Sequence, residues 1–150
     1  MVRRRLRLKV VLDTNVLVRS LHSPRSDSFN RRIVWQWLAE KRLQLLVSDE
    51  LIAEYLEVFE RVLDFNANLL DFWRQRFTTD ERVTMIQLGP RRVGSRDADD
   101  DLLLSVADVG KADVLVTNDR DLLELPQNVR QCLSFAIVSP RDFLRQISPD

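Results

Sequence analysis

Short, nearly all-apolar runs alternate with longer amphipathic segments along this chain, and this alternation constrains its fold more than any other feature. LKVVL (8–12), LQLLV (43–47), VLVT (114–117) and FAIV (135–138) predict strands, and VTMIQL (83–88) predicts an added strand or a loop. Strands that are apolar on both faces are typical of a parallel sheet covered on both sides.

The segments between these runs have helical periodicity. Helices are predicted over SFNRRIVWQWLAEKR (28–42), DELIAEYLEVFERVL (49–63), ANLLDFWRQRF (67–77) and DDDLLLSVADVG (99–110), the last ending near Gly110 as its cap. The order of elements predicts an α/β fold, a three-layer α/β/α sandwich around a central, mainly parallel sheet of four to five strands. The length of 150 residues, 45% of them hydrophobic, predicts a single domain over 1–150.

Composition excludes several kinds of site. Twenty-three basic side chains balance 23 acidic ones, so no net positive field indicates nucleic acid. The single cysteine, Cys132, excludes an internal disulfide framework and a cysteine-based zinc site, and it is expected to be a small packing residue of a cytoplasmic protein. His22, the only histidine, is expected in a solvated loop. Asp13 and Arg19 interrupt the N-terminal apolar run before it reaches signal-peptide length, and no later run is long enough to cross a membrane.

Acidic residues follow the predicted strands. In a parallel sheet, ligands bind outside the carboxyl ends of the strands, where Asp13 and Asp119 are expected. In the helix over 49–63, Glu54 lies at the edge of the apolar face, whereas Glu57 projects away from it. Asp121 is expected to cap the short helical turn LLEL. Asp13, Glu54 and Asp119 are therefore candidate ligands.

A fourth group of acids opens the helix of SRDADDDLLLSVADVG. Asp100 has apolar residues at positions i+3, i+4 and i+7, so it is the one predicted to point towards the core. Asp97, one turn earlier, is expected to act as a cap or an outer ligand. Asp99 and Asp101 remain alternatives for direct ligation.

Four carboxylates at one edge of a sheet would repel one another without a counter-charge. Oxygen donors without histidine or cysteine select a hard ion, Mg²⁺ or Mn²⁺. One or two such ions can activate a water molecule and stabilise the charge that develops on a phosphate, and no histidine is available as a base. Composition and spacing therefore predict hydrolysis of a phosphodiester.

The same motifs resemble a known family. VVLDTNVLV, SDELIAEYLEVF, RDADDDLLLSVA and ADVLVTNDRDLL are similar, in this order, to the acidic motifs of PIN-domain nucleases, and AIVSPRDFL (136–144) resembles the last strand and helix of that family. In detail they resemble the branch of VapC-like toxins of toxin-antitoxin systems. The resemblance implies a Mg²⁺- or Mn²⁺-dependent ribonuclease that is inhibited by a small antitoxin protein, and it makes a homodimer an expected assembly.

The resemblance also assigns roles to individual residues. It places the four acids of the family on Asp13, Glu54, Asp100 and Asp119, and it implies that Asn15 and Thr117 support them through hydrogen bonds. The chain departs from the third motif of the family, because Ala98 and Asp101 replace its usual proline and asparagine. This departure leaves open which acids of that motif bind the metal directly.

Side chains for RNA and protein contacts are predicted less specifically. Arginines lie in or beside the motif loops at Arg19, Arg25, Arg91, Arg92, Arg96 and Arg120. Guanidinium groups suit bidentate contacts with phosphate, so these arginines are the candidate RNA-facing rim. Trp35, Trp37 and Trp73 are expected in the core or an interface, and the helices at 33–37 and 69–77 could supply a dimer or antitoxin surface.

Other functions fit parts of the pattern. One alternative is a catalytically silent PIN-fold module that binds RNA or an antitoxin, and another is a PIN nuclease of RNA processing and decay. A phosphotransfer receiver would need an acceptor aspartate after its third strand and a lysine near its fifth, and neither is evident. An aspartate-nucleophile phosphatase would need an aspartate where Asn15 stands.

Overall fold

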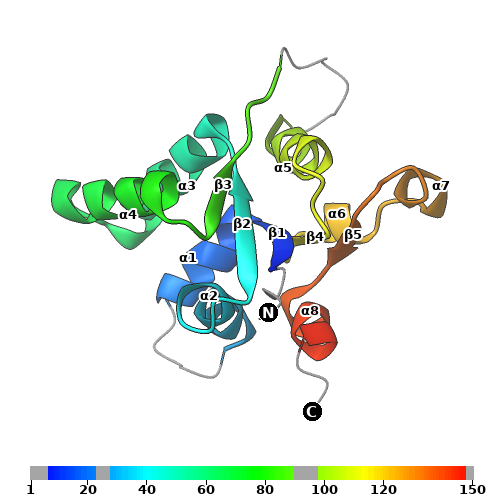
Figure 1. Ribbon diagram of the computed structural model, residues 1–150, viewed down its shortest axis with the longest axis horizontal. Coiled ribbons are helices and arrows are strands. Elements are labelled where there is room, and N and C mark those ends of the chain that lie inside the picture. Colours follow the sequence, from blue (N-terminus) through cyan, green and yellow to red (C-terminus); the bar gives the residue numbers. More distant parts are fainter. Residues whose placement is uncertain (1–6, 23–27, 90–97, 148–150) are drawn as a thin grey trace, which may run out of the picture.

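A five-stranded, all-parallel sheet forms the centre of the computed structural model, which describes residues 7–22, 28–89 and 98–147. Its strands are β1 (Leu8–Leu12), β2 (Leu43–Val47), β3 (Val83–Met85), β4 (Val114–Val116) and β5 (Ala136–Val138). The order β3-β2-β1-β4-β5 places β1 in the middle, with Val10 in register with Leu45 on one side and Val114 on the other (Figure 1). The predicted α/β fold is confirmed.

Helices cover both faces of this sheet and flank the edge formed by β3. They are α1 (Thr14–His22), α2 (Phe29–Leu38), α3 (Asp49–Leu63), α4 (Ala67–Thr79), α5 (Ala98–Val109), α6 (Arg120–Leu123), α7 (Gln127–Arg130) and α8 (Pro140–Ile147). Figure 1 shows α5 over one face and α2 with α8 over the other, while α3 and α4 flank the β3 edge and α7 projects beyond β5. None of the helices in the described ranges is long and apolar enough to cross a bilayer.

Side-chain caps explain why several helices begin where they do. The Ser48 hydroxyl accepts from the backbone N–H of Leu51 at 3.1 Å, and the Asn66 side chain accepts from Leu69 at 2.9 Å. The left-handed backbone of Asp64, with φ of 56°, ends α3. The predicted bounds of this helix, 49–63, are confirmed.

Other predicted local features are wrong. No helix was expected after Asp13, yet α1 begins at Thr14, and His22 is its exposed last residue rather than part of a loop. Cys132 is exposed and not a packing residue. Helix α5 ends at Val109, next to Gly110 as predicted, but the left-handed residue after it is Lys111 and not Gly110. Gly110 is needed for space, because a Cβ there would lie 2.9 Å from the side chain of Leu46.

Five aromatic side chains form a buried group between α2, α3 and α4, here called the aromatic layer: Trp37, Tyr55, Phe59, Trp73 and Phe77. Phe77 lies at its centre, with ring centroids 5.3 Å from Tyr55, 5.7 Å from Trp73 and 6.1 Å from Trp37. The predicted core position is confirmed for Trp37 and Trp73. Trp35 on the same helix as Trp37 is 60% exposed.

Candidate functional site

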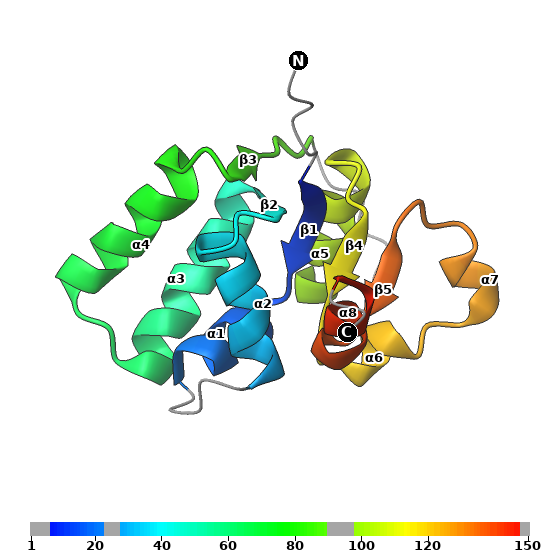
Figure 2. The same ribbon diagram turned by 60° about the horizontal axis from the view of Figure 1, so that its bottom comes forward.

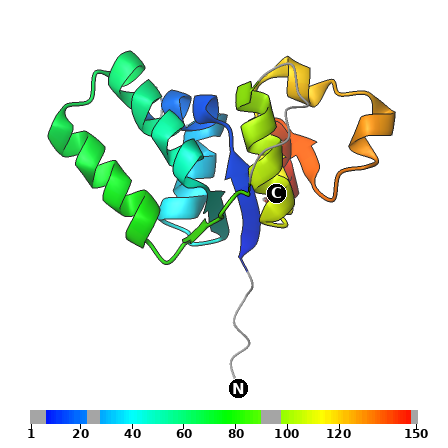
Figure 3. The same cartoon turned by 90° about the horizontal axis from the view of Figure 1, so that it is seen from above.

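The carboxyl ends of β1 and β4 open into a pocket of about 340 Å³. Its lining residues are Asp13, Thr14, Asn15, Val18, Glu54, Val58, Arg61, Val62, Leu103 and Asp119. Figures 2 and 3 show α1 and α6 at the end of the sheet opposite to the N-terminus, where these two strands finish. The fold thus brings three of the predicted acids, Asp13, Glu54 and Asp119, to one pocket.

Asp13 is nearly enclosed at this edge, with only 9% of its surface exposed. Its backbone N–H donates to the carbonyl of Val116 at 3.0 Å, which continues the pairing of β1 with β4. Burial raises the pKa of its carboxyl group, and the charge of Asp119 adds to this effect. Hydrogen bonds from the Thr117 side chain and from the backbone of Thr14 and Asn15 oppose the rise in pKa. The site therefore holds a carboxylate whose charge is costly without a cation.

Thr117 joins two of the acids. Its hydroxyl donates to Oδ2 of Asp13 at 2.6 Å and accepts from the backbone N–H of Asp119 at 2.9 Å. The residue is fully buried, so its bond to Asp13 is shielded from water. One threonine side chain thus fixes the carboxylate of Asp13 and the backbone of the following acid.

Asp119 also begins α6. Its Oδ1 accepts from the backbone N–H of Asp121 at 2.9 Å, so Asp119 is the N-cap. The expectation that Asp121 caps this turn is wrong, because the helix starts at Arg120, two residues before the LLEL segment. The cap fixes the orientation of the Asp119 carboxylate in the pocket lining.

Glu54 reaches the pocket from α3. The hydroxyl of Thr14, the first residue of α1, donates to its Oε2 at 2.6 Å. The sequence patterns did not identify Thr14 as a residue of the site, although its position between Asp13 and Asn15 could have indicated this role. Tyr55, next to Glu54, donates to the carbonyl of Leu12 at 2.5 Å and holds α3 against β1. Burial raises the pKa of Tyr55, and the charges of Asp13 and Glu54 raise it further.

The third acidic motif is described only in part. Asp100 lies in the first turn of α5, but the side chains of Asp99 and Asp100 are outside what the structure describes, as is all of Asp97. Leu103, three residues after Asp100, lines the pocket and is buried. Leu103 therefore brings α5 to the wall of this pocket.

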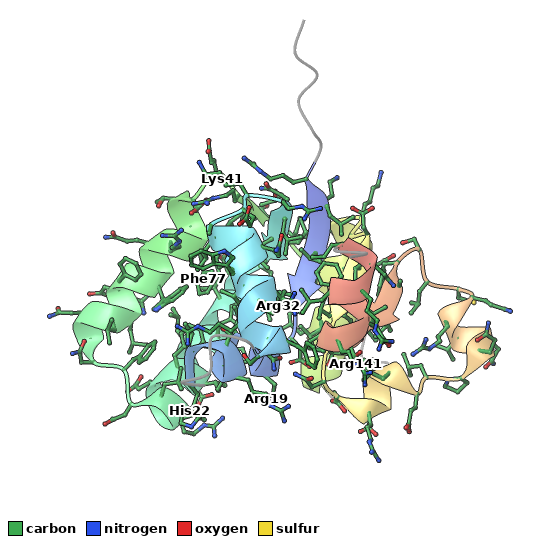
Figure 4. The ribbon with its side chains drawn as sticks, turned by 90° about the horizontal axis from the view of Figure 1, so that it is seen from below. Arg19, His22, Arg32, Lys41, Phe77 and Arg141 are labelled. Atoms are coloured by element: carbon green, nitrogen blue, oxygen red, sulfur yellow. The ribbon has the colours of Figure 1, made fainter. Side chains whose placement is uncertain are left out.

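The predicted polar and basic residues occupy varied positions. Asn15 is exposed at the pocket lining, and Thr117 lies behind Asp13. Arg19 and Arg120 are exposed on α1 and α6, whereas Arg25, Arg91, Arg92 and Arg96 fall outside the described residues. Figure 4 shows Arg19 with Arg141 of α8 at the end of the molecule opposite Lys41, which precedes β2. Arg141 was not among the predicted residues.

The donors at this pocket suit a hard cation. All the titratable donors are carboxylates, and within the described ranges no ion pair neutralises the buried Asp13. No group of three or more acidic, histidine or cysteine side chains in the described part of the chain is close enough together to hold a metal ion. The three carboxylates of the pocket lining are nevertheless the kind of donor that Mg²⁺ or Mn²⁺ prefers.

Comparison with known proteins agrees with this arrangement. The model of the PIN domain family matches residues 9–121, a range that contains all four predicted acids. Among solved structures, the chain is similar to one described as VapBC2 from Rickettsia felis bound to a DNA fragment from their promoter. The TM-score is 0.53 at 15% identity, covering 88% of this chain and 98% of that chain, so the likeness is one of fold.

No curated protein matches the chain. The family assignment therefore depends on the match over 9–121, which covers most of the sequence, including β4 and nearly all of β1, the strands that precede Asp119 and Asp13. This chain belongs to the PIN domain family.

Proposed function

We propose that this protein is a metal-dependent endoribonuclease that hydrolyses RNA phosphodiester bonds and is the toxin of a toxin-antitoxin pair. The observation that carries the proposal is the convergence of Asp13, Glu54 and Asp119 on one pocket at the carboxyl edge of the central strand. Membership of the PIN domain family and the likeness to a VapBC2 structure support it. The catalytic residues are Asp13, Glu54, Asp100 and Asp119.

These four carboxylates would hold Mg²⁺ or Mn²⁺, with Asp97 as an outer ligand. When bound, such an ion supplies activation of water and stabilisation of the negative charge that develops on the phosphate. The protein contributes orientation. Thr117 holds one oxygen of Asp13 and Thr14 holds one oxygen of Glu54, while the backbone of Asn15 donates a further hydrogen bond to the Asp13 carboxylate.

The substrate would approach along the carboxyl edge of the sheet. Exposed arginines on α1 and α6, Arg19 and Arg120, lie beside the motif residues at this edge. Together with Arg91, Arg92 and Arg96 they would contact the phosphates of RNA, which position a nucleic acid without selecting its sequence. We also propose that the protein acts in the cytoplasm, that residues 1–150 form a single domain and that the protein forms a homodimer.

Substitution on α3 tests the nuclease with a matched control. We expect Glu54→Gln to abolish cleavage of a labelled single-stranded RNA in Mn²⁺, as should EDTA or Asp13→Asn, because each removes a metal ligand or the metal. Glu60→Gln, an exposed acid on the same helix outside the pocket, should retain full activity. Undiminished cleavage by Glu54→Gln and in EDTA would refute the mechanism.

Two further measurements separate this function from its alternatives. Calorimetry should detect Mn²⁺ binding to the wild type and weaker binding to Asp13→Asn, whereas a catalytically silent module would bind RNA without turnover. A small protein encoded beside this one should co-purify with it and silence it. An active nuclease with no such partner would instead be an enzyme of RNA processing and decay.

A further inference from the structure

The pocket lining contains one basic side chain among its acids. Of the residues that line it in the described part of the chain, Asp13, Glu54 and Asp119 are acidic, and Arg61 alone is basic. Arg61 follows Glu54 by seven residues on α3, which is two helical turns and about 10 Å along the axis. The guanidinium group of Arg61 therefore lies on the same face of α3 as Glu54, a candidate metal ligand, and two turns further along the helix.

An ion pair orients this arginine. Its Nε donates to Oε1 of Glu57 at 2.9 Å, one turn earlier on α3. An arginine has five N–H donors, and a bond through Nε leaves the four on the terminal nitrogens for another acceptor. Glu57 thus limits the rotation of the side chain without using the donors that best match a phosphate.

Stability does not explain the pair. The side chains of Arg61 and Glu57 are 63% and 59% exposed, and an ion pair so open to water contributes little to folding. Nor does packing explain it, because most of the Arg61 side chain is open to water. What distinguishes Arg61 is its place in the lining of the pocket that contains Asp13, Glu54 and Asp119.

The surroundings of Arg61 match part of a nucleotide. Val58 and Val62 line the pocket beside it, and Val62 is 46% exposed although it is apolar. An exposed apolar surface next to a cation suits a ligand with a charged and an uncharged part, such as a phosphate with its sugar and base. Bare carboxylates would repel this ligand, so the cation on the rim has an electrostatic purpose.

We propose that Arg61 binds a backbone phosphate of the substrate at the rim of the pocket and that Glu57 positions its guanidinium. The inference rests on the proposed ribonuclease function, and it adds a substrate-binding residue outside the acidic motifs. It predicts a contribution to RNA affinity that depends on salt, because contacts with phosphate release counterions.

The chain offers a matched control for this ion pair. Arg74 pairs with Asp71 on α4 at 2.6 Å, with side chains 54% and 66% exposed. This pair is as exposed as Arg61 with Glu57, but Arg74 lines a different pocket, between α3 and α4. Removal of Arg74 therefore changes the net charge by the same amount as removal of Arg61. It leaves intact the pocket that contains Asp13, Glu54 and Asp119, here called the acidic pocket.

Kinetics of RNA cleavage in Mn²⁺ test the proposal. We expect Arg61→Ala to raise KM for a labelled single-stranded RNA by roughly tenfold, the effect of losing one charge-assisted hydrogen bond, with a smaller change in kcat. Arg61→Lys should recover part of this loss, and Glu57→Gln should raise KM less than Arg61→Ala does. Arg74→Ala should match the wild type.

A binding assay makes the result independent of turnover. In the Asp13→Asn background, fluorescence anisotropy should show that Arg61→Ala weakens RNA binding and reduces the slope of log affinity against log salt by about one. Equal KM, affinity and salt slope for Arg61→Ala and Arg74→Ala would overturn the proposal. If the wild type cleaves no RNA, the proposed function fails, and anisotropy still decides whether Arg61 binds phosphate.

Discussion

The two sides of α3 serve opposite purposes. One side places Tyr55 and Phe59 in the aromatic layer, where both are fully buried and contact Phe77. The other side places Glu54 and Arg61 at the acidic pocket. The buried side gains free energy from removing apolar surface from water, whereas the pocket side gathers like charges at an electrostatic cost.

This difference shows how the molecule tolerates its site. The carboxylate of Asp13 is held in a largely buried place that raises its pKa, so the pocket lowers stability unless a cation is present. The aromatic layer offsets that cost and keeps α3 in position, and the Tyr55 hydroxyl links the layer to the end of β1. Substitutions in the two regions should therefore separate stability from activity.

The largest expected effect is in the aromatic layer. Trp37→Ala should lower the free energy of unfolding by about 3–5 kcal/mol, because it leaves a cavity where a fully buried ring packs against Phe77. Urea unfolding followed by circular dichroism measures this loss. Trp35→Ala on the same helix, where the ring is 60% exposed, should change stability by less than about 0.5 kcal/mol. Equal losses for both variants would contradict the assigned core.

Removal of the hydroxyl between the acids should come next. Thr117→Val should reduce RNA cleavage by roughly 10–100-fold, because neither the carboxylate of Asp13 nor the backbone of Asp119 is then fixed. Thr117→Ser keeps the hydroxyl and should restore most of the rate. Initial rates in Mn²⁺ provide the comparison, and a Thr117→Val enzyme as fast as Thr117→Ser would show that this hydroxyl does not position the site.

The smallest effect concerns stability and pH. The pKa of Asp13 in the folded protein is raised above its ordinary value of 3.8, which applies to the unfolded chain. As pH rises from 3.8 towards the folded-state pKa, Asp13 therefore loses its proton in the unfolded chain before it does so in the folded protein. Stability due to this group is therefore lost as pH rises through that window. Asp13→Asn cannot ionise, and in EDTA its Tm should equal or slightly exceed that of the wild type near neutral pH.

The gap in Tm should close as pH falls below the ordinary value for aspartate, because both states of the wild type are then protonated. Mn²⁺ should raise the Tm of the wild type more than that of the variant, since binding to the folded state stabilises it. A variant that is less stable than the wild type in EDTA at neutral pH would show that the Asp13 carboxylate is not a cost.

Strong local signals made much of the fold predictable. The apolar runs over 8–12 and 43–47 match β1 and β2, and the capped amphipathic segment over 49–63 matches α3. Errors occurred where one signal served two purposes. Asp119 is a predicted ligand that is also the helix cap, and Asp13 with Thr14 ends a strand and begins a helix without a turn between them.

The sequence by itself determined the strands, most of the longer helices, their parallel arrangement and the candidate acids, because apolar periodicity and residue type are local properties of the chain. Only the tertiary structure decided that Thr14 binds Glu54, that Thr117 joins Asp13 to Asp119, and that Arg61 shares their pocket. The bond from Thr14 to Glu54 and the bond from Thr117 to Asp13 join residues 40 and 104 positions apart, so they depend on which strands are neighbours and on how α3 packs across them. No local pattern encodes that distance.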